Sequence, residues 1–191
     1  GDTAMNRVYI GLVALALAAT APAETFIVDT GHAEVGFSVK HMMVSNTKGK
    51  FNTFKGTIDY DIATKMLKSV EGTIDVASID TNNETRDKHL RNEDFFNVKK
   101  YPKMTFKSTS VKKTGDNTFE VTGKLNVLGV DRKVVIPVTI NGPVDGRGGG
   151  KLIGIECTTT LNRRDLGITH SPAAAIGDSV KISIEAEATF K

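Results

Sequence analysis

Near its C-terminal end the chain reads Val180-Lys-Ile-Ser-Ile-Glu-Ala-Glu-Ala-Thr-Phe190. Apolar residues occupy every second position of this stretch, and polar residues stand between them. Because successive side chains of a β-strand point to opposite faces, this period of two predicts a strand with one dry face and one wet face. The same period returns along most of the chain, so the sequence predicts an all-β protein.

The other strand-like segments are separated by short, turn-rich connections. Residues 56–62 and 70–76 alternate on either side of a turn and are predicted to pair as an antiparallel hairpin. The N-terminal part predicts two strands, over residues 25–29 and 35–41, with a turn at Thr30-Gly31 between them. Further strands are predicted over residues 48–54, 101–108, 119–127, 134–140 and 153–161.

Two local features need separate interpretation. Pro137 falls on the polar parity of its strand, which favours an edge or bulged position because proline donates no backbone hydrogen bond. The run Gly146-Arg-Gly-Gly-Gly-Lys151 lacks the first Gly and the final Ser or Thr of a phosphate-binding loop, and a strand follows it. We therefore interpret this run as a hairpin loop within the turn-rich residues 141–150.

Eight to ten antiparallel strands with one dry face favour an up-and-down β-barrel of about eight strands. Closure of the sheet removes its exposed edges, and the apolar parity then faces the lumen. A barrel of this size holds either its own side chains or one small ligand.

Residues 81–96 form the one stretch that departs from this β pattern. Thr81-Asn-Asn83 supplies N-cap chemistry, and Leu90, Phe95 and Phe96 provide an apolar side. We predict one or two short helices here, which act as a lid over one end of the barrel with this apolar side toward the lumen.

The polar side of this segment, Arg86-Asp87-x-His89-Leu-Arg91, leaves two interpretations open. It could form an acid/base group or an anion site near a helix N-terminus. Alternatively, it is a solvated helical face in which Asp87 pairs with Arg91 at i,i+4, and the arginines lie outside or at the rim. We favour the solvated face.

The composition suits one globular domain that binds no nucleic acid. The 191 residues are 39% hydrophobic and 25% charged, which allows a sizeable core. The net charge is +3, and the basic residues are scattered rather than clustered.

The N-terminus predicts export. After Met5 come a basic residue, a short apolar run and Ala21-Pro-Ala23, which together are typical of a cleavable secretory signal over residues 5–23. Residues 1–4 precede the initiator methionine and are set aside. We expect cleavage after Ala23, a periplasmic or secreted product, and a single barrel domain over residues 24–191.

No residue set argues for covalent catalysis, so the protein is not expected to be an enzyme. There is no G-x-S-x-G elbow, and the single cysteine, Cys157, shares the apolar parity of its strand and is expected to be buried and inert. The four histidines lack the close spacing of a zinc site, and no metal site is assigned. His41-Met-Met43 is the best copper or haem candidate, although adjacent strand residues point to opposite faces.

The predicted lumen face mixes large and small side chains. Either the two sizes alternate to fill a tapered core, or the small residues leave an elongated apolar channel. The large residues are Phe37, Tyr60, Phe106 and Phe119, and the small ones are Gly56, Gly72, Ser78, Ser108, Gly123, Ala186 and Ala188.

Several ordered motifs give the chain a resemblance to the YceI-like family. They cover nearly all of the expected mature chain. The matching elements are Phe26 to His41, Gly49-Lys-Phe51 with Phe54-x-Gly56, Thr81, Arg86 to Arg91, Asp94-Phe-Phe96, Tyr101-Pro102, Gly123-x-Leu125, Gly129-Val130, Arg163, Gly167-Ile168 and Gly177-Asp178-x-Val180.

This resemblance implies an exported, lipocalin-like barrel that binds a polyisoprenoid, an isoprenoid quinone or a fatty-acid-like lipid, and it favours the channel. It implies no required cofactor, and it is compatible with an inner-membrane partner and with a homodimer. Leu166, Asn126 and Asp131 depart from the family's usual residues near a channel wall or mouth. The identity of the lipid is therefore left open. The expected lipid-binding residues are Phe37, Val39, Phe51, Ile58, Tyr60, Ile74, Val76, Leu90, Phe95, Phe96, Met104, Phe106, Phe119, Leu125, Ile136 and Ile155. The competing class is an exported haem, copper or non-lipid interaction protein.

Overall fold

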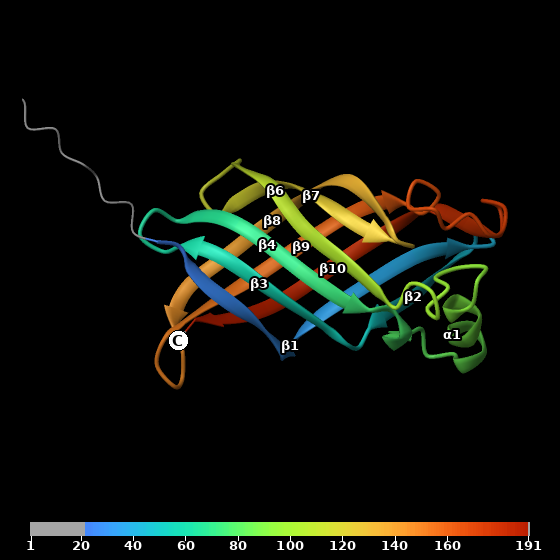
Figure 1. The fold of residues 1–191 in the computed structure, drawn as a ribbon, viewed down its shortest axis with the longest axis horizontal. Coiled ribbons are helices and arrows are strands. Elements are labelled where there is room, and N and C mark those ends of the chain that lie inside the picture. The colour runs from blue at the N-terminus through green and yellow to red at the C-terminus, as the bar shows by residue number, and fades with distance from the viewer. Residues whose placement is uncertain (1–21, 191) are drawn as a thin grey trace, which may run out of the picture.

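The computed structural model describes residues 22–190, so all but the last two residues of the predicted signal segment lie outside the described part. Within it the chain forms ten strands and one α-helix (Figure 1). The strands are β1 Glu24–His41, β2 Ser45–Phe51, β3 Phe54–Asp61, β4 Met66–Asp75, β5 Ile79–Asp80, β6 Lys103–Lys113, β7 Thr118–Val127, β8 Val130–Asp145, β9 Lys151–Asn162 and β10 Ile176–Phe190.

Eight of these strands close into a barrel. Their order is β10-β9-β8-β7-β6-β4-β3-β1, and β10 pairs back onto β1. All the neighbouring pairs are antiparallel, for example Phe37 of β1 opposite Ile182 of β10. The predicted up-and-down barrel is confirmed, and β2 and β5 extend it beyond β1 as a short flap.

β1 is one long strand rather than the two that the sequence predicts. Asp29 pairs with Glu187 and Ala33 pairs with Ala186, so residues 30–32 form a bulge without partners on β10. The predicted turn at Thr30-Gly31 is wrong, because these residues bulge out of β1 and bend the strand instead of ending it. The bend lets β1 pair with β3 at its start and with β2 at its end.

β8 is longer than predicted and is paired on both sides over only part of its length. Residues 130–139 pair with β7, whereas the described pairing with β9 starts at Thr139. Pro137 therefore lies where β8 behaves as an edge, as its missing N–H predicts. Asn141 to Asp145 continue β8, and the predicted hairpin loop occupies residues 146–150.

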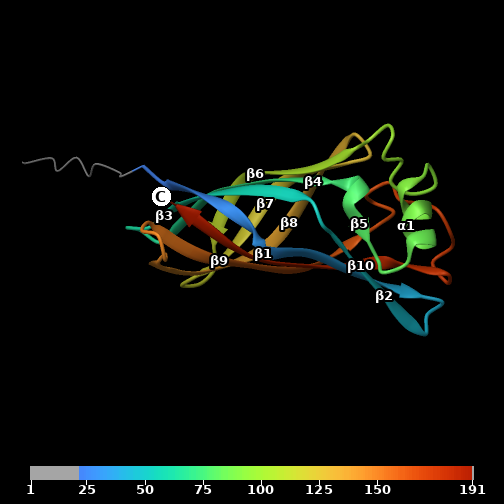
Figure 2. The same ribbon diagram turned by 90° about the horizontal axis from the view of Figure 1, so that it is seen from below.

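The helical segment of residues 81–96, which we call the cap, covers one end of the barrel (Figure 2). Helix α1 spans Glu84–Arg91, and the side chain of its N-cap Asn83 accepts a hydrogen bond from the Arg86 N–H. A separate 3₁₀ turn, Val76–Ser78, ends the predicted strand 70–76 early. None of the described helices is long and apolar enough to cross a membrane.

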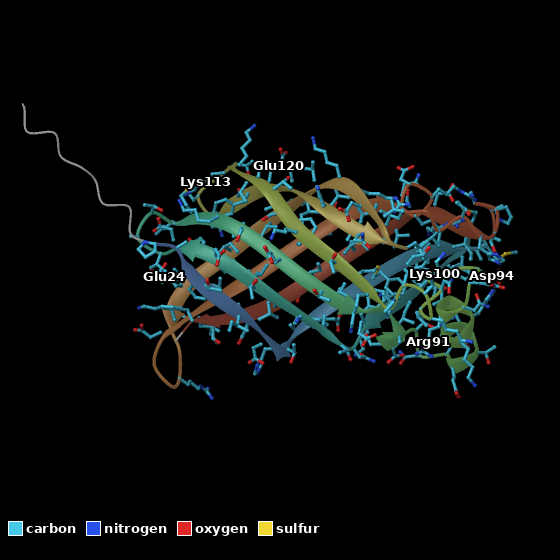
Figure 3. All side chains as sticks on the ribbon, viewed as in Figure 1. Glu24, Arg91, Asp94, Lys100, Lys113 and Glu120 are labelled. Carbon is cyan, nitrogen blue, oxygen red and sulfur yellow. The ribbon has the colours of Figure 1, made fainter. Side chains whose placement is uncertain are left out.

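Two buried clusters lie at opposite ends of the barrel. The first gathers Phe26, Tyr60 and Phe119 at the end marked by Glu24, Lys113 and Glu120 in Figure 3. The second gathers residues beneath the cap, next to the end marked by Arg91 and Asp94. Its buried members are Phe51, Val76, Ile79, Phe95, Met104, Val127 and Ile168.

Candidate functional site

A cavity of about 330 Å³ occupies the barrel interior. All eight strands of the barrel, the cap and the β9–β10 loop contribute to its lining, and β7 contributes only from its second half. The lining includes members of both buried clusters. The side chains that line it are mostly aliphatic and aromatic, such as Val70, Phe106 and Ile184, and Cys157, Thr159 and Arg163 also border it. The barrel therefore encloses an apolar chamber beneath the cap.

Thirteen of the sixteen predicted residues border this cavity. They are Phe37, Val39, Phe51, Ile58, Ile74, Leu90, Phe95, Phe96, Met104, Phe106, Leu125, Ile136 and Ile155. The other three, Tyr60, Val76 and Phe119, do not border it. Tyr60 and Phe119 pack in the filled end of the barrel, and Val76 lies in the 3₁₀ turn under the cap.

The predicted small residues divide into two groups. Gly56, Gly72 and Ala186 border the cavity, and a β-carbon at Gly72 would have only one backbone atom within 4 Å, the Lys55 carbonyl oxygen at 3.7 Å. The others serve local packing. The Ser108 hydroxyl accepts a hydrogen bond from the Val70 N–H at 2.9 Å, and a β-carbon at Gly123 would collide with the Phe106 ring. Ser78 accepts from the Thr53 N–H, and Ala188 is fully buried in the filled end.

Several inward-facing side chains are only half-buried. Phe37, Phe106, Ile136 and Ile182 border the cavity yet keep part of their surface accessible. In a close-packed core such side chains would be buried, since protein interiors leave few voids larger than a water molecule. The channel interpretation is therefore favoured over a fully filled core.

The apolar side of the cap faces the cavity as predicted. Leu90, Phe95 and Phe96 all border it, and the Phe96 ring meets the Phe51 ring edge-on at a centroid distance of 6.1 Å. The cap thus forms part of the cavity wall and closes one end of it.

The polar side of the cap is the predicted solvated face only in part, because Arg86 and Lys88 are exposed whereas Asp87 is not. Asp87 is buried, and its carboxylate accepts hydrogen bonds from the N–H and the hydroxyl of Thr81 at 3.0 and 2.6 Å. Arg86 donates to the Thr81 hydroxyl and carbonyl oxygens, each at 2.8 Å. These three residues lock the start of the cap segment.

Arg91 does not pair with Asp87 either. It donates to the carbonyl oxygens of Ala77 and Ile79, each at 2.8 Å. The predicted i,i+4 ion pair is therefore wrong, and Arg91 instead fastens α1 to the 3₁₀ turn and β5. The acid/base interpretation also loses its groups, because Arg86, Asp87 and Arg91 are used in holding the cap.

Sequence reasoning gave no role to Arg163, the first residue of the β9–β10 loop. Its side chain is 3% exposed, and its five N–H groups donate to five backbone carbonyls at 2.7–3.1 Å. Burial lowers the pKa of its guanidinium, while the nearby Asp178 carboxylate favours the charged form. The acceptors are the carbonyl oxygens of Gly177, Ile168, His170, Ser171 and Ile176.

Other cavity residues were also missed. Val180, Ile182 and Ile184 of β10 border the cavity, and their shared parity in the sequence was the available signal. Leu166 comes from the β9–β10 loop, where no period-two pattern exists to place it, and Ile176 is the first residue of β10. Leu166 lies at the cavity wall as expected.

Asn126 and Asp131 do not border the cavity. The Asn126 side-chain amide donates to the Asp131 carboxylate at 2.7 Å between β7 and β8. These two departures from the usual family residues therefore lie away from the chamber.

His41-Met-Met43 lies at the tip of the β1–β2 hairpin, away from the cavity lining. Met42 and Met43 are exposed, and both have positive φ angles, as the two central residues of a tight hairpin turn require. His41 pairs with Ser45 across the hairpin. These residues form a turn rather than a part of the chamber.

The comparisons with known proteins agree with this architecture. The sequence pattern of the YceI-like domain matches residues 26–188. The chain belongs to the YceI-like family. A UPF0312 protein of Ectopseudomonas mendocina is 40% identical over 156 residues, which cover 82% of this chain and 81% of that protein.

Solved structures of similar proteins have the same barrel fold. The Campylobacter jejuni YCEI protein is 36% identical, with a TM-score of 0.74, over 80% of this chain and 90% of that chain. A polyisoprenoid binding domain from Saccharophagus degradans has a TM-score of 0.65 over 88% of this chain and 99% of that chain. At 13% identity, this second likeness concerns the fold alone.

Cys157 borders the cavity of this YceI-like barrel and allows a prediction about its thiol. Burial raises the pKa of Cys157 to about 11, so the neutral thiol dominates at pH 7. We expect its alkylation by iodoacetamide to accelerate about tenfold per pH unit up to pH 10, because the thiolate is the nucleophile. Mass spectrometry of timed samples measures this rate.

The matched control is Ser45→Cys in a Cys157→Ser background, which places a thiol at an exposed hairpin position. Its rate should level off above about pH 9, as expected for an ordinary thiol pKa of about 8.5. A plateau of the Cys157 rate at the same pH would contradict the burial effect.

Proposed function

We propose that this YceI-like protein binds a long-chain apolar lipid in its barrel, a polyisoprenoid or isoprenoid quinone, with a fatty-acid-like chain as the alternative. The observation that carries the proposal is the apolar cavity under the cap, bordered by Leu90, Phe95 and Phe96. Its volume of about 330 Å³ falls in the range of small-molecule pockets, about 300–1,000 Å³.

The chemistry of the lining favours an apolar ligand. Arg163 is the charged side chain that lies buried at the cavity, and all its N–H groups already donate to backbone carbonyls. The bordering residues Glu34, Lys55 and Glu71 are exposed on the outer parity of their strands. A bound ligand therefore meets hydrocarbon on most sides and has no free charge to neutralise.

The hydrophobic effect supplies the driving force for such binding. Each isoprene unit gains roughly 4 kcal/mol gross when its five carbons leave water, at about 0.8 kcal/mol per CH₂-sized group, before ordering costs. The Saccharophagus degradans domain, described as polyisoprenoid binding, adds support through its shared fold. A binding role rather than catalysis also fits the use of Arg86, Asp87 and Arg91 in holding the cap.

The ligand enters at the cap end. The opposite end is filled by the buried side chains of Phe26, Tyr60 and Phe119. The tail then lies in the lumen and the head group near the cap. No cofactor is required for this role.

Solvent extraction of the purified protein followed by mass spectrometry tests the proposal directly. An isoprenoid or other long-chain lipid in stoichiometric amount is the expected result. An extract without lipid, together with visible absorption of the protein, would point to the haem or copper alternative instead.

We further propose that the protein acts in the periplasm, where it transports, stores or senses its lipid and receives it from an inner-membrane partner. A homodimer is compatible with this role. Ala21 and Ala23 occupy the small-residue positions of a signal cleavage site. N-terminal sequencing of protein from an exporting host should start at Glu24, whereas a full-length soluble product would refute export.

Ala186→Phe tests whether the chamber is needed for retention. Ala186 borders the cavity in the middle of β10, so a phenylalanine there should occupy ligand space. We expect loss of most extractable lipid with little change in the melting temperature of delipidated protein. In a filled core the same change would overpack and cost about 1–3 kcal/mol.

Glu185→Phe is the matched control, because it adds the same side chain to the exposed face of the same strand. It should keep its lipid. Clear destabilisation by Ala186→Phe with unchanged lipid content would show that the lipid lies elsewhere.

Removal of the cap's apolar side should weaken retention. Phe95→Ala with Phe96→Ala takes two rings from the cavity wall, so we expect the lipid dissociation rate to rise at least about tenfold, since losing about 1.4 kcal/mol of contact suffices. Transfer of a fluorescent lipid to acceptor vesicles measures this rate. Lys88→Ala, which removes an exposed side chain from the same helix, should leave it unchanged.

Equal rates in the parent and in the Phe95→Ala, Phe96→Ala protein would mean that the cap does not hold the ligand. The lipid would then have to be retained by the strands alone.

A further inference from the structure

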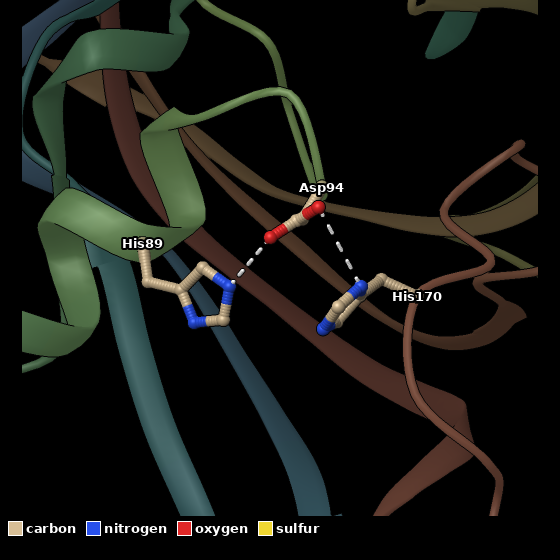
Figure 4. Close-up of side chains that lie close together, drawn as sticks. All are labelled: His89, Asp94 and His170. Carbon is tan, nitrogen blue, oxygen red and sulfur yellow. Dashed lines mark hydrogen bonds and ion pairs between the residues drawn. The ribbon is translucent and has the colours of Figure 1, made fainter.

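Three potential metal ligands meet at the cap end of the barrel (Figure 4). His89 belongs to α1, Asp94 follows the helix, and His170 comes from the β9–β10 loop. Within residues 22–190 this is the group of His, Cys, Asp and Glu side chains whose geometry could hold an ion. Sequence spacing could not reveal it, because the two histidines approach each other only through the fold.

The ligand atoms are close to the separation that a metal requires. His89 Nε2 lies 3.0 Å from Asp94 Oδ2, and His170 Nδ1 lies 3.8 Å from Asp94 Oδ1. One ligand atom from each residue can be chosen so that all three lie within 4.8 Å of one another. Tetrahedral zinc with bonds of about 2.0–2.1 Å places its ligands about 3.3 Å apart, so side-chain rotations are enough to close the site.

The surroundings orient the two imidazoles. The centroid of the Phe95 ring lies 5.0 Å from the ring centroids of both histidines, and the ring is edge-on to His89 and tilted to His170. The carbonyl of His170 accepts a hydrogen bond from Arg163 at 2.7 Å, which fixes the backbone of that ligand. Groups that hold a ligand in place contribute to metal affinity as well as the ligands themselves.

The chemistry of the donor set selects the class of ion. Two imidazoles and one carboxylate suit Zn²⁺ and related divalent transition metals rather than Mg²⁺ or Ca²⁺, which prefer oxygen ligands. The side chains of His89, Asp94 and His170 are 48%, 43% and 37% exposed, so a water molecule can provide the fourth ligand.

We propose that His89, Asp94 and His170 form a binding site for a zinc-class divalent metal ion. Because His89 and Asp94 belong to the cap segment and His170 to the β9–β10 loop, the ion ties two separate segments together across the cap end. Phe95 lies between them and borders the cavity. Metal binding therefore holds the cap shut, and this second consequence rests on the proposed lipid-binding function.

Titration of tag-free, delipidated protein with Co²⁺ tests the site without reference to any lipid. The expected result is one ion per chain, with a ligand-field absorption that Zn²⁺ displaces. His89→Ala and His170→Ala should each weaken binding by about 100-fold or more, since even the loss of an outer-shell partner costs about 10–100-fold. Circular dichroism confirms that the variants are folded.

His32→Ala is the matched control. His32 also pairs with an aspartate, Asp29, at 2.9 Å, but that pair lies on the β1 bulge and includes no second histidine. Its removal should leave Co²⁺ binding unchanged. Failure of the parent to bind Co²⁺, or equal binding by His170→Ala, would overturn the site.

The proposal that the metal ion holds the cap shut is tested separately, through the rate of lipid transfer to vesicles. Zn²⁺ should slow transfer from the parent and have no effect on His170→Ala. Equal transfer rates with Zn²⁺ and with a chelator, in protein that binds Co²⁺, would show that the metal ion does not hold the cap shut. The metal site itself would still stand. A protein without lipid would overturn the proposed function while the titration still decides the site.

Discussion

The backbone carbonyls at the cap end of this barrel need hydrogen-bond donors, and two arginines, the buried Arg163 and the half-buried Arg91, supply them. Loops that cross the end of a sheet have no neighbouring strand, and a buried carbonyl left without a donor costs about 1–3 kcal/mol. Arg163 meets five carbonyls with its five N–H groups, and Arg91 meets two more. Lysine has only three donors and no planar fork, so it could not replace Arg163. The end is thus ordered without filling the lumen, and this leaves room for a chamber.

The two ends of the barrel are therefore stabilised in different ways. Phe26, Tyr60 and Phe119 fill one end and give the closed sheet a conventional core. The other end uses charge-assisted hydrogen bonds outside the chamber and a layer of apolar cap residues facing into it. A ligand that leaves this chamber uncovers mostly hydrocarbon, and the buried charge at the wall, Arg163, keeps its backbone acceptors whether or not a ligand is bound.

The sequence predicted what depends on local pattern. The period of two gave the strands, their antiparallel pairing and the inward parity, while the loss of that period located the cap. Parity alone cannot place a residue along the barrel axis, which is why Tyr60 and Phe119 were taken as cavity residues. Asp87 and Arg163 were misjudged or missed for a related reason. Their partners are backbone groups or short polar side chains, which no spacing rule identifies, and the meeting of His89 with His170 arises only from the closed fold.

The attachments of the cap are unequal on its two sides, and this decides where it opens. On one side, β5 pairs with β2 at Lys50 and Phe51, and Arg91 adds two hydrogen bonds to the same region. On the other side, the cap meets the β9–β10 loop through ring contacts and the 3.8 Å approach of His170 to Asp94. Directed hydrogen bonds to backbone resist separation more than a long, partly exposed ion pair does. The cap should therefore turn about β5 and part from the β9–β10 loop first, and a metal ion between His89, Asp94 and His170 would strengthen the side that otherwise gives way.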